Sequence, residues 1–135
     1  MQFYPAGSRP TRRAPAENFT GTVWQDPIIT APAPARVVAN RVAFEAGART
    51  AWHTHPFGQT LYVISGVGRF QTQGQPIIEI KPGDVIWIPP GEKHWHGASA
   101  TNAMTHVAMQ ESLDGNHITW MEPVTDEEYA VKVGG

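Results

Sequence analysis

Residues 47–60 read GARTAWHTHPFGQT and place His53 and His55 two positions apart. In a β-strand, residues i and i+2 point to the same face, so the two imidazoles would project together. A face that carries several neutral imidazoles is costly to desolvate unless a partner accepts their lone pairs, and a divalent cation does so well. The pattern therefore predicts a metal site on one face of a strand.

A second histidine pair occurs at His94 and His96, in the segment PGEKHWHG of residues 90–97. The same strand periodicity puts both rings on one face. In the next apolar run, residues 103–111, the alternation places His106 and Gln110 on a shared face. If that face points inward, His106 and Gln110 line the same cavity as the pairs. His117 lies beside Asn116 in a predicted turn, where we expect it to be exposed and inert.

Short apolar runs separated by turn residues continue along the chain, which is typical of an all-β sandwich or closed barrel. We expect strands at 20–24, 37–44, 49–55, 60–64, 68–72, 77–80, 85–88, 94–97 and 103–111. Asp26-Pro27 should end the first of them, and the runs 60–64 and 68–72 should form a hairpin.

Three regions are predicted along the chain. Residues 1–34 are rich in proline and alanine and should form an extended N-terminal arm with one short strand. Residues 35–123 should form the barrel. Residues 124–135 should form a short helix and tail, because Thr125 and Glu128 have the spacing of a capping box.

The composition excludes several classes of protein. A chain of 135 residues with 41% hydrophobic residues suits one folded domain, and a formal charge of −2 offers no basic surface for nucleic acid. Cysteine is absent, which rules out disulfides and thiolate ligands. We found no apolar run of membrane-spanning or signal-peptide type, so the sequence predicts a cytoplasmic protein.

Two motifs give the chain a family resemblance. The first is G-x5-H-x-H-x3-Q-x6-G, from Gly47 to Gly66, and the second is G-x5-P-x-G-x2-H, from Gly83 to His94. They resemble the two motifs of the cupin superfamily, whose fold is a small jelly-roll barrel (a double-stranded β-helix) with a metal inside one end. The resemblance implies four metal ligands, which are His53, His55, Gln59 and His94.

Two positions depart from the family pattern. The second motif usually closes with asparagine, where this chain has Ala98, and that residue is not a ligand. The fourth ligand is usually glutamate, where this chain has Gln59. An all-neutral ligand set leaves the charge of the cation undiminished and favours a strong Lewis acid. We expect one divalent metal per subunit, with manganese first and Fe, Ni, Zn and Co as alternatives.

A closer resemblance extends over most of the chain. The runs around Gly47, Pro90 and Ala103, together with Trp120-Met121-Glu122, look like the small bacterial manganese cupins described as hydroxynitrile lyases. That group adds two histidines at the positions of His96 and His106. The resemblance implies Lewis-acid binding of the cyanohydrin hydroxyl, with His96 as general base and His106 beside the departing cyanide.

Two other functions stay open at this point. Three-histidine cupins that hold Fe²⁺ can act as dioxygenases, and a cupin can also bind a small molecule without catalysis. For all three functions the partner is a small molecule.

The tryptophans at 52, 87 and 95 suit packing on the outside of the barrel, and an apolar outer face favours a homodimer or homotetramer.

Overall fold

The computed structural model describes all residues from 1 to 135 and is built almost entirely of β-strands. The strands are β1 Arg12–Arg13, β2 Phe19–Thr20, β3 Val23–Thr30, β4 Val37–Phe44, β5 Arg49–Thr50, β6 His53–Thr54, β7 Gln59–Gly66, β8 Gly68–Thr72, β9 Ile78–Ile80, β10 Val85–Ile88, β11 His94–Ala98, β12 Met104–Glu111 and β13 Thr119–Trp120. The one α-helix, α1, spans Asp126–Tyr129. The all-β prediction is confirmed. None of the helical structure is long and apolar enough to cross a membrane.

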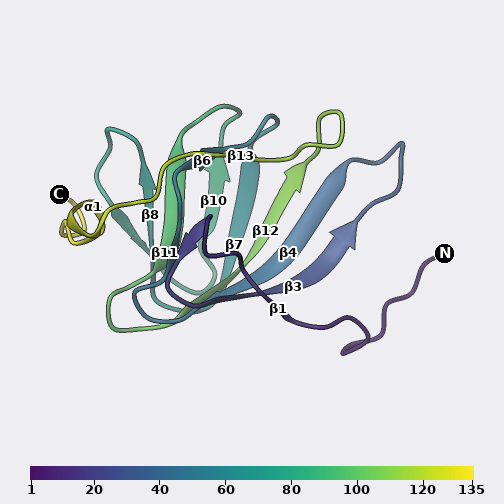
Figure 1. Ribbon diagram of the computed structural model, residues 1–135, viewed down its shortest axis with the longest axis horizontal. Coiled ribbons are helices and arrows are strands. Elements are labelled where there is room, and N and C mark those ends of the chain that lie inside the picture. Colours follow the sequence, from purple (N-terminus) through teal and green to yellow (C-terminus); the bar gives the residue numbers. More distant parts are fainter.

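The strands form two antiparallel sheets that curl toward each other. One sheet has the order β1-β3-β4-β12-β7-β10, and its strands β3, β4, β12 and β7 lie side by side in Figure 1. The other has the order β13-β6-β11-β5-β2, with β8 paired to β11 and β9 paired to β8. Apart from the successive pairs β3 with β4, β5 with β6 and β8 with β9, each strand lies in the other sheet from the strand before it, which is the jelly-roll arrangement expected from the sequence.

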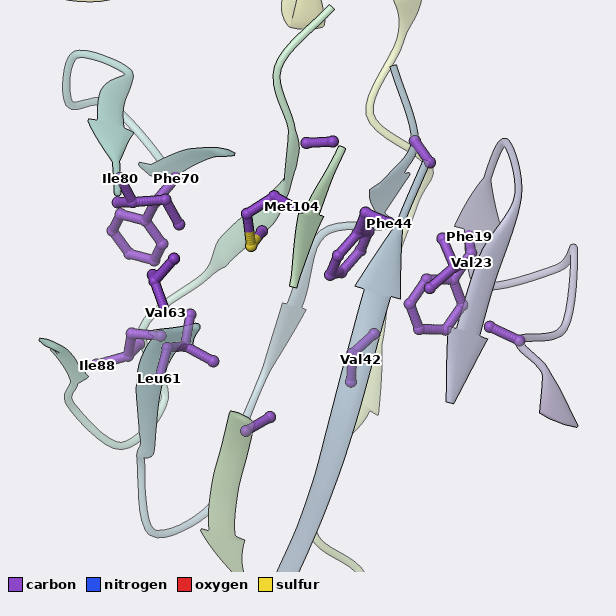
Figure 2. Packing of buried hydrophobic residues seen from close by; sticks show 14 residues of the cluster. Phe19, Val23, Val42, Phe44, Leu61, Val63, Phe70, Ile80, Ile88 and Met104 are labelled. Atoms are coloured by element: carbon purple, nitrogen blue, oxygen red, sulfur yellow. The ribbon is translucent and has the colours of Figure 1, made fainter. Parts of the chain in front are cut away.

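Fourteen buried hydrophobic residues from both sheets form the main core. Figure 2 shows Phe19 and Val23 at one side of this cluster, Leu61 and Ile88 at the other, and Phe44 between them. Val23, Leu61 and Ile88 are fully buried. Full burial of a side chain of this size stabilises the fold by roughly 1.5–3 kcal/mol, so this cluster holds the two sheets together.

The inner face of β12 continues from this core into the polar part of the barrel. The buried residues of β12 are Met104, His106, Ala108 and Gln110, which is the shared inward face that the alternation predicts. β12 pairs with β4 on one side and with β7 on the other. Its side chains therefore lie near the middle of the six-stranded sheet.

The predicted hairpin between residues 60–64 and 68–72 is wrong. β7 pairs with β10 and β12, whereas β8 pairs with β9 and β11 in the other sheet. The chain crosses between sheets after Gly66, where φ is +82° and a Cβ would lie 1.8 Å from the carbonyl oxygen of Ala103. Only glycine fits this crossing, so the residues between the two runs mark a change of sheet instead of a hairpin turn.

The predicted end of the first strand is also wrong. β3 continues through Asp26 and Pro27 to Thr30, and its pairing with β4 shifts between Pro27 and Ile29. Proline lacks the N–H that a regular ladder needs, and an irregularity of this kind accommodates it. The longer strand matters because it extends the wall of the barrel.

The C-terminal helix has the capping box that the sequence predicts. The Glu128 amide donates to Thr125 Oγ1, and the Thr125 amide donates to Glu128 Oε1. Tyr129 packs against Trp95 with ring centroids 5.7 Å apart, and its hydroxyl donates to the carbonyl of Ala98 at 2.6 Å. The helix therefore covers the outer side of β11. In Figure 1 it lies at the opposite side of the molecule from the N-terminus.

Candidate metal centre and active site

Five histidines and two glutamines converge inside the barrel from the four strands β6, β7, β11 and β12 and from the loop after β6. All seven side chains are buried: His53, His55, Gln59, His94, His96, His106 and Gln110. His94 stands directly opposite His53 in the pairing of β11 with β6. The two histidine pairs come from neighbouring strands of one sheet, and His106 faces them from the other sheet.

Three of the rings are oriented by main-chain carbonyl groups. In each ring Nδ1–H donates to a backbone oxygen: His53 to Ala51 at 2.8 Å, His55 to His117 at 2.7 Å and His94 to Glu92 at 2.8 Å. A neutral imidazole carries one proton, so these bonds leave the lone pair on Nε2. His55 Nε2 is buried and has no hydrogen-bond partner.

The amide of Gln59 has its oxygen turned toward the imidazoles. Gln59 Nε2 donates to Gln110 Oε1 at 3.0 Å, which leaves Gln59 Oε1 at 3.2 Å from His94 Nε2. His94 donates from Nδ1, so both atoms of this contact are acceptors and neither supplies a proton. A cation bound by both atoms would satisfy the contact, so the residues present fit a metal ion.

The nitrogens that converge most tightly are those of His53, His94 and His96, which lie within 4.8 Å of one another. The ring of His53 is 4.2 Å from that of His94 and 5.0 Å from that of His55, measured between centroids. Four imidazoles therefore surround the same point, and two of them, His55 and His96, are alternatives for the third nitrogen ligand.

His96 differs from His55 in what its second nitrogen contacts. His96 Nδ1 lies 2.9 Å from Nε2 of His106, which makes an imidazole–imidazole hydrogen bond. The outer atoms of this pair, His96 Nε2 and His106 Nδ1, are buried without partners. A hydrogen bond between two imidazoles can share a proton, which a bond to a backbone carbonyl cannot do.

Burial keeps all five rings neutral at physiological pH. Desolvation lowers the pKa of His55, His94 and His106 to about 4. It also lowers the pKa of His53 and His96 well below the ordinary value, with repulsion from neighbouring imidazoles as a further cause. Neutral rings have the free lone pair that metal ligation and proton acceptance both require.

A cavity of about 70 Å³ adjoins these histidines. Its other lining residues are Phe19, Gln25, Asn40, Val42, Phe44, Thr50, Ala108, His117, Ile118 and Trp120. Trp120 packs against His53 with ring centroids 4.9 Å apart and the two planes tilted by 46°. Since a buried water needs roughly 10–15 Å³ on this measure, the cavity has room for a small organic group.

Sequence reasoning missed several of these lining residues. Gln25 and Asn40 belong to no motif, although alternation along β3 and β4 could have placed both on the inner face. Trp120 is part of the closer family resemblance, but the resemblance gives it no role at the site. The prediction that the His117 side chain is exposed is wrong. Its side chain is half-buried at the cavity, and its carbonyl accepts the hydrogen bond from His55.

Comparison with known proteins places this geometry among relatives. The family model described as "Cupin domain" matches residues 40–109. The chain is 57% identical over 129 residues to a protein of Granulicella tundricola named (R)-mandelonitrile lyase, covering 96% of this chain and 98% of that protein.

Solved structures give the same result for the fold. A cupin-like protein of Thermotoga maritima superposes with a TM-score of 0.82 at 35% identity, covering 96% of this chain and 95% of that one. A polyketide cyclase of Streptomyces resistomycificus gives a TM-score of 0.73 at 16% identity, covering 96% and 90%. The second likeness is one of fold alone.

Proposed function

The chain belongs to the cupin family, and we propose that it is a metal-dependent hydroxynitrile lyase that cleaves cyanohydrins such as mandelonitrile. The products are an aldehyde and hydrogen cyanide, and the enzyme would also catalyse the reverse addition. The observation that carries the proposal is the near full-length similarity to the (R)-mandelonitrile lyase. The buried histidine cluster supports it, because the cluster offers both a metal site and a free base.

We assign the metal to His53, His55, His94 and Gln59. The carbonyl-oriented rings and the amide oxygen that faces His94 support this set. A bound divalent cation supplies a Lewis acid that lowers the pKa of a hydroxyl beside it. The amide oxygen suits hard ions, which supports manganese as the metal. Gln110 acts as a positioning residue, since it holds the Gln59 amide in the orientation that ligation needs.

His96 is the proposed general base. A ring nitrogen of His96 lies within 4.8 Å of those of His53 and His94, and its Nε2 is buried without a partner, so this nitrogen is available to accept the hydroxyl proton of the substrate. This role requires the neutral tautomer in which His96 Nδ1–H donates to His106 Nε2. After proton transfer, His96 carries a positive charge that the hydrogen bond to His106 stabilises.

The remaining steps balance without any further reactant. As His96 takes the hydroxyl proton, the carbonyl double bond forms and the bond to the nitrile carbon breaks, with its electron pair leaving on cyanide. His106 has a second buried nitrogen, Nδ1, without a partner. We propose that the His96–His106 pair returns the proton to cyanide and releases hydrogen cyanide.

We also propose that the protein is a homo-oligomer. Trp87 and Val85 on β10 are 59% and 63% exposed, and Tyr62 on the adjacent β7 is paired with Val85 and is also exposed. A contiguous apolar surface of this kind favours association with a second copy. The assembly as a homodimer or homotetramer stays a prediction, and so does the cytoplasmic location.

The proposed function is tested by mandelonitrile cleavage together with metal analysis. We expect the manganese-loaded protein to release benzaldehyde, and His53→Ala to lose both metal and activity. His117→Ala serves as a matched control, because it removes an imidazole from the same cavity but keeps the carbonyl that orients His55. An unchanged cleavage rate in metal-free His53→Ala would contradict the proposal.

A further inference from the structure

A second hollow lies next to the histidine cavity, under the N-terminal segment. It has a volume of about 330 Å³ and shares two lining residues, Gln25 and Asn40, with the histidine cavity. Its complete lining is Arg9, Pro10, Arg12, Gln25, Pro27 and Asn40. We call it the outer hollow. A ligand too long for the inner cavity would extend past Gln25 and Asn40 into this space.

The strand register connects the outer hollow to the catalytic histidines. Arg12 on β1 stands opposite Gln25, Gln25 opposite Val42, and Val42 opposite His106. Residues directly opposite each other in antiparallel strands share a face, so these four side chains form one row along the inner surface. Three strand spacings of about 4.8 Å separate the ends of the row by roughly 14 Å, and the long side chain of Arg12 shortens that gap.

The two spaces contain positive charges only, and both charges lie in the outer hollow. The inner cavity has no Asp, Glu, Lys or Arg in its lining, and the only charged residues of the outer hollow are Arg9 and Arg12. Arg9 is held in place, with its guanidinium 4.1 Å from the Tyr4 ring centroid and donating to the carbonyl of Ile28 at 3.1 Å.

Arg12 is the free group of this hollow. Its guanidinium makes no hydrogen bond or ion pair within the chain. It lines the same hollow as the guanidinium of Arg9, which is held by its own contacts. A carboxylate placed between Arg9 and Arg12 would relieve their repulsion and accept charge-assisted hydrogen bonds.

We infer that the outer hollow binds a carboxylate group at the end of the substrate remote from the reacting carbon. The inference rests on the proposed function and specifies its substrate class: aldehydes and cyanohydrins that carry a carboxylate. The inner cavity of about 70 Å³ takes the reacting group, and the rest of the molecule passes Gln25 and Asn40 toward Arg12.

The test compares cyanide addition to 4-carboxybenzaldehyde and to benzaldehyde in the manganese-loaded wild type, Arg12→Gln and Arg13→Gln. Arg13 is a matched control, because it stands opposite Trp24 on the other face of β1 and donates to Thr22 at 3.3 Å. We expect Arg12→Gln to raise KM for 4-carboxybenzaldehyde about two- to fivefold, because Arg12 is exposed and its charge is screened by water, and to leave KM for benzaldehyde unchanged. Arg13→Gln should change neither value.

A binding measurement keeps the two proposals distinguishable. Calorimetry with 4-(hydroxymethyl)benzoate and its methyl ester, which cannot react, should give a tighter Kd for the acid in the wild type and an equal Kd in Arg12→Gln. Arg13→Gln should keep the wild-type difference in Kd. Equal effects of Arg12→Gln and Arg13→Gln in either experiment would overturn the inference. Failure of the wild type to convert both aldehydes would contradict the lyase function, and the calorimetry would still decide whether the carboxylate binds.

Discussion

Replacing His96 with alanine is expected to remove most of the turnover and leave the metal in place, whereas His55→Ala should remove the metal. The difference follows from the second nitrogen of each ring. His55 is oriented by a backbone carbonyl and keeps a free Nε2, whereas His96 is hydrogen-bonded to the imidazole of His106. A positioned general base contributes about 10²–10⁴-fold to a rate, so kcat should fall by that factor in His96→Ala.

The assay pairs metal content per subunit after gel filtration with kcat for mandelonitrile cleavage. His96→Ala also breaks one buried hydrogen bond to His106, at 2.9 Å, which should cost on the order of 1 kcal/mol or somewhat more and leave the protein folded. The nitrogens of His53, His94 and His96 lie within 4.8 Å of one another, so the geometry also allows His96 to be a ligand. Loss of metal from His96→Ala with metal retained in His55→Ala would refute the reasoning.

Three further results are expected. Gln110→Leu removes the acceptor that holds the Gln59 amide, so the metal affinity should fall about 10–100-fold in a chelator competition, and an unchanged affinity would count against this positioning role. Tyr129→Phe deletes the buried hydrogen bond to Ala98 and should lower the free energy of unfolding by about 1–2 kcal/mol in urea titration, with kcat unaltered. Mandelonitrile cleavage should proceed at the same rate without oxygen, since no step consumes it, whereas oxygen-dependent turnover would favour a dioxygenase.

Much of the barrel can be predicted from the sequence because the alternation of residues along each strand depends only on neighbouring positions in the chain. Alternation along 103–111 placed His106 and Gln110 on one face, and both are buried there. The paired histidines at 53 and 94 could be assigned to one site because each pair has the same i, i+2 spacing. The roles of the individual residues at that site stay predictions until metal and rate are measured.

The remaining features depend on contacts between distant segments. The sheet change after Gly66 is set by the approach of the Ala103 carbonyl, which no local pattern reveals. His117 orients His55 through its backbone carbonyl, and a residue of any type has that group, so the sequence could not predict this contact. Arg12 reaches the inner surface only through the pairing of β1 with β3, and two residues are too few to give a strand pattern.

The backbone carbonyls that orient His53, His55 and His94 have a consequence for how such a protein can change over time. A point mutation can replace any side chain, but it leaves the oxygen of every peptide group where it is. Most substitutions of neighbouring side chains therefore leave the tautomers of these three rings unchanged. Laboratory evolution could therefore redraw the substrate pocket, for instance at Gln25 or Asn40, without disturbing how the imidazoles are aimed.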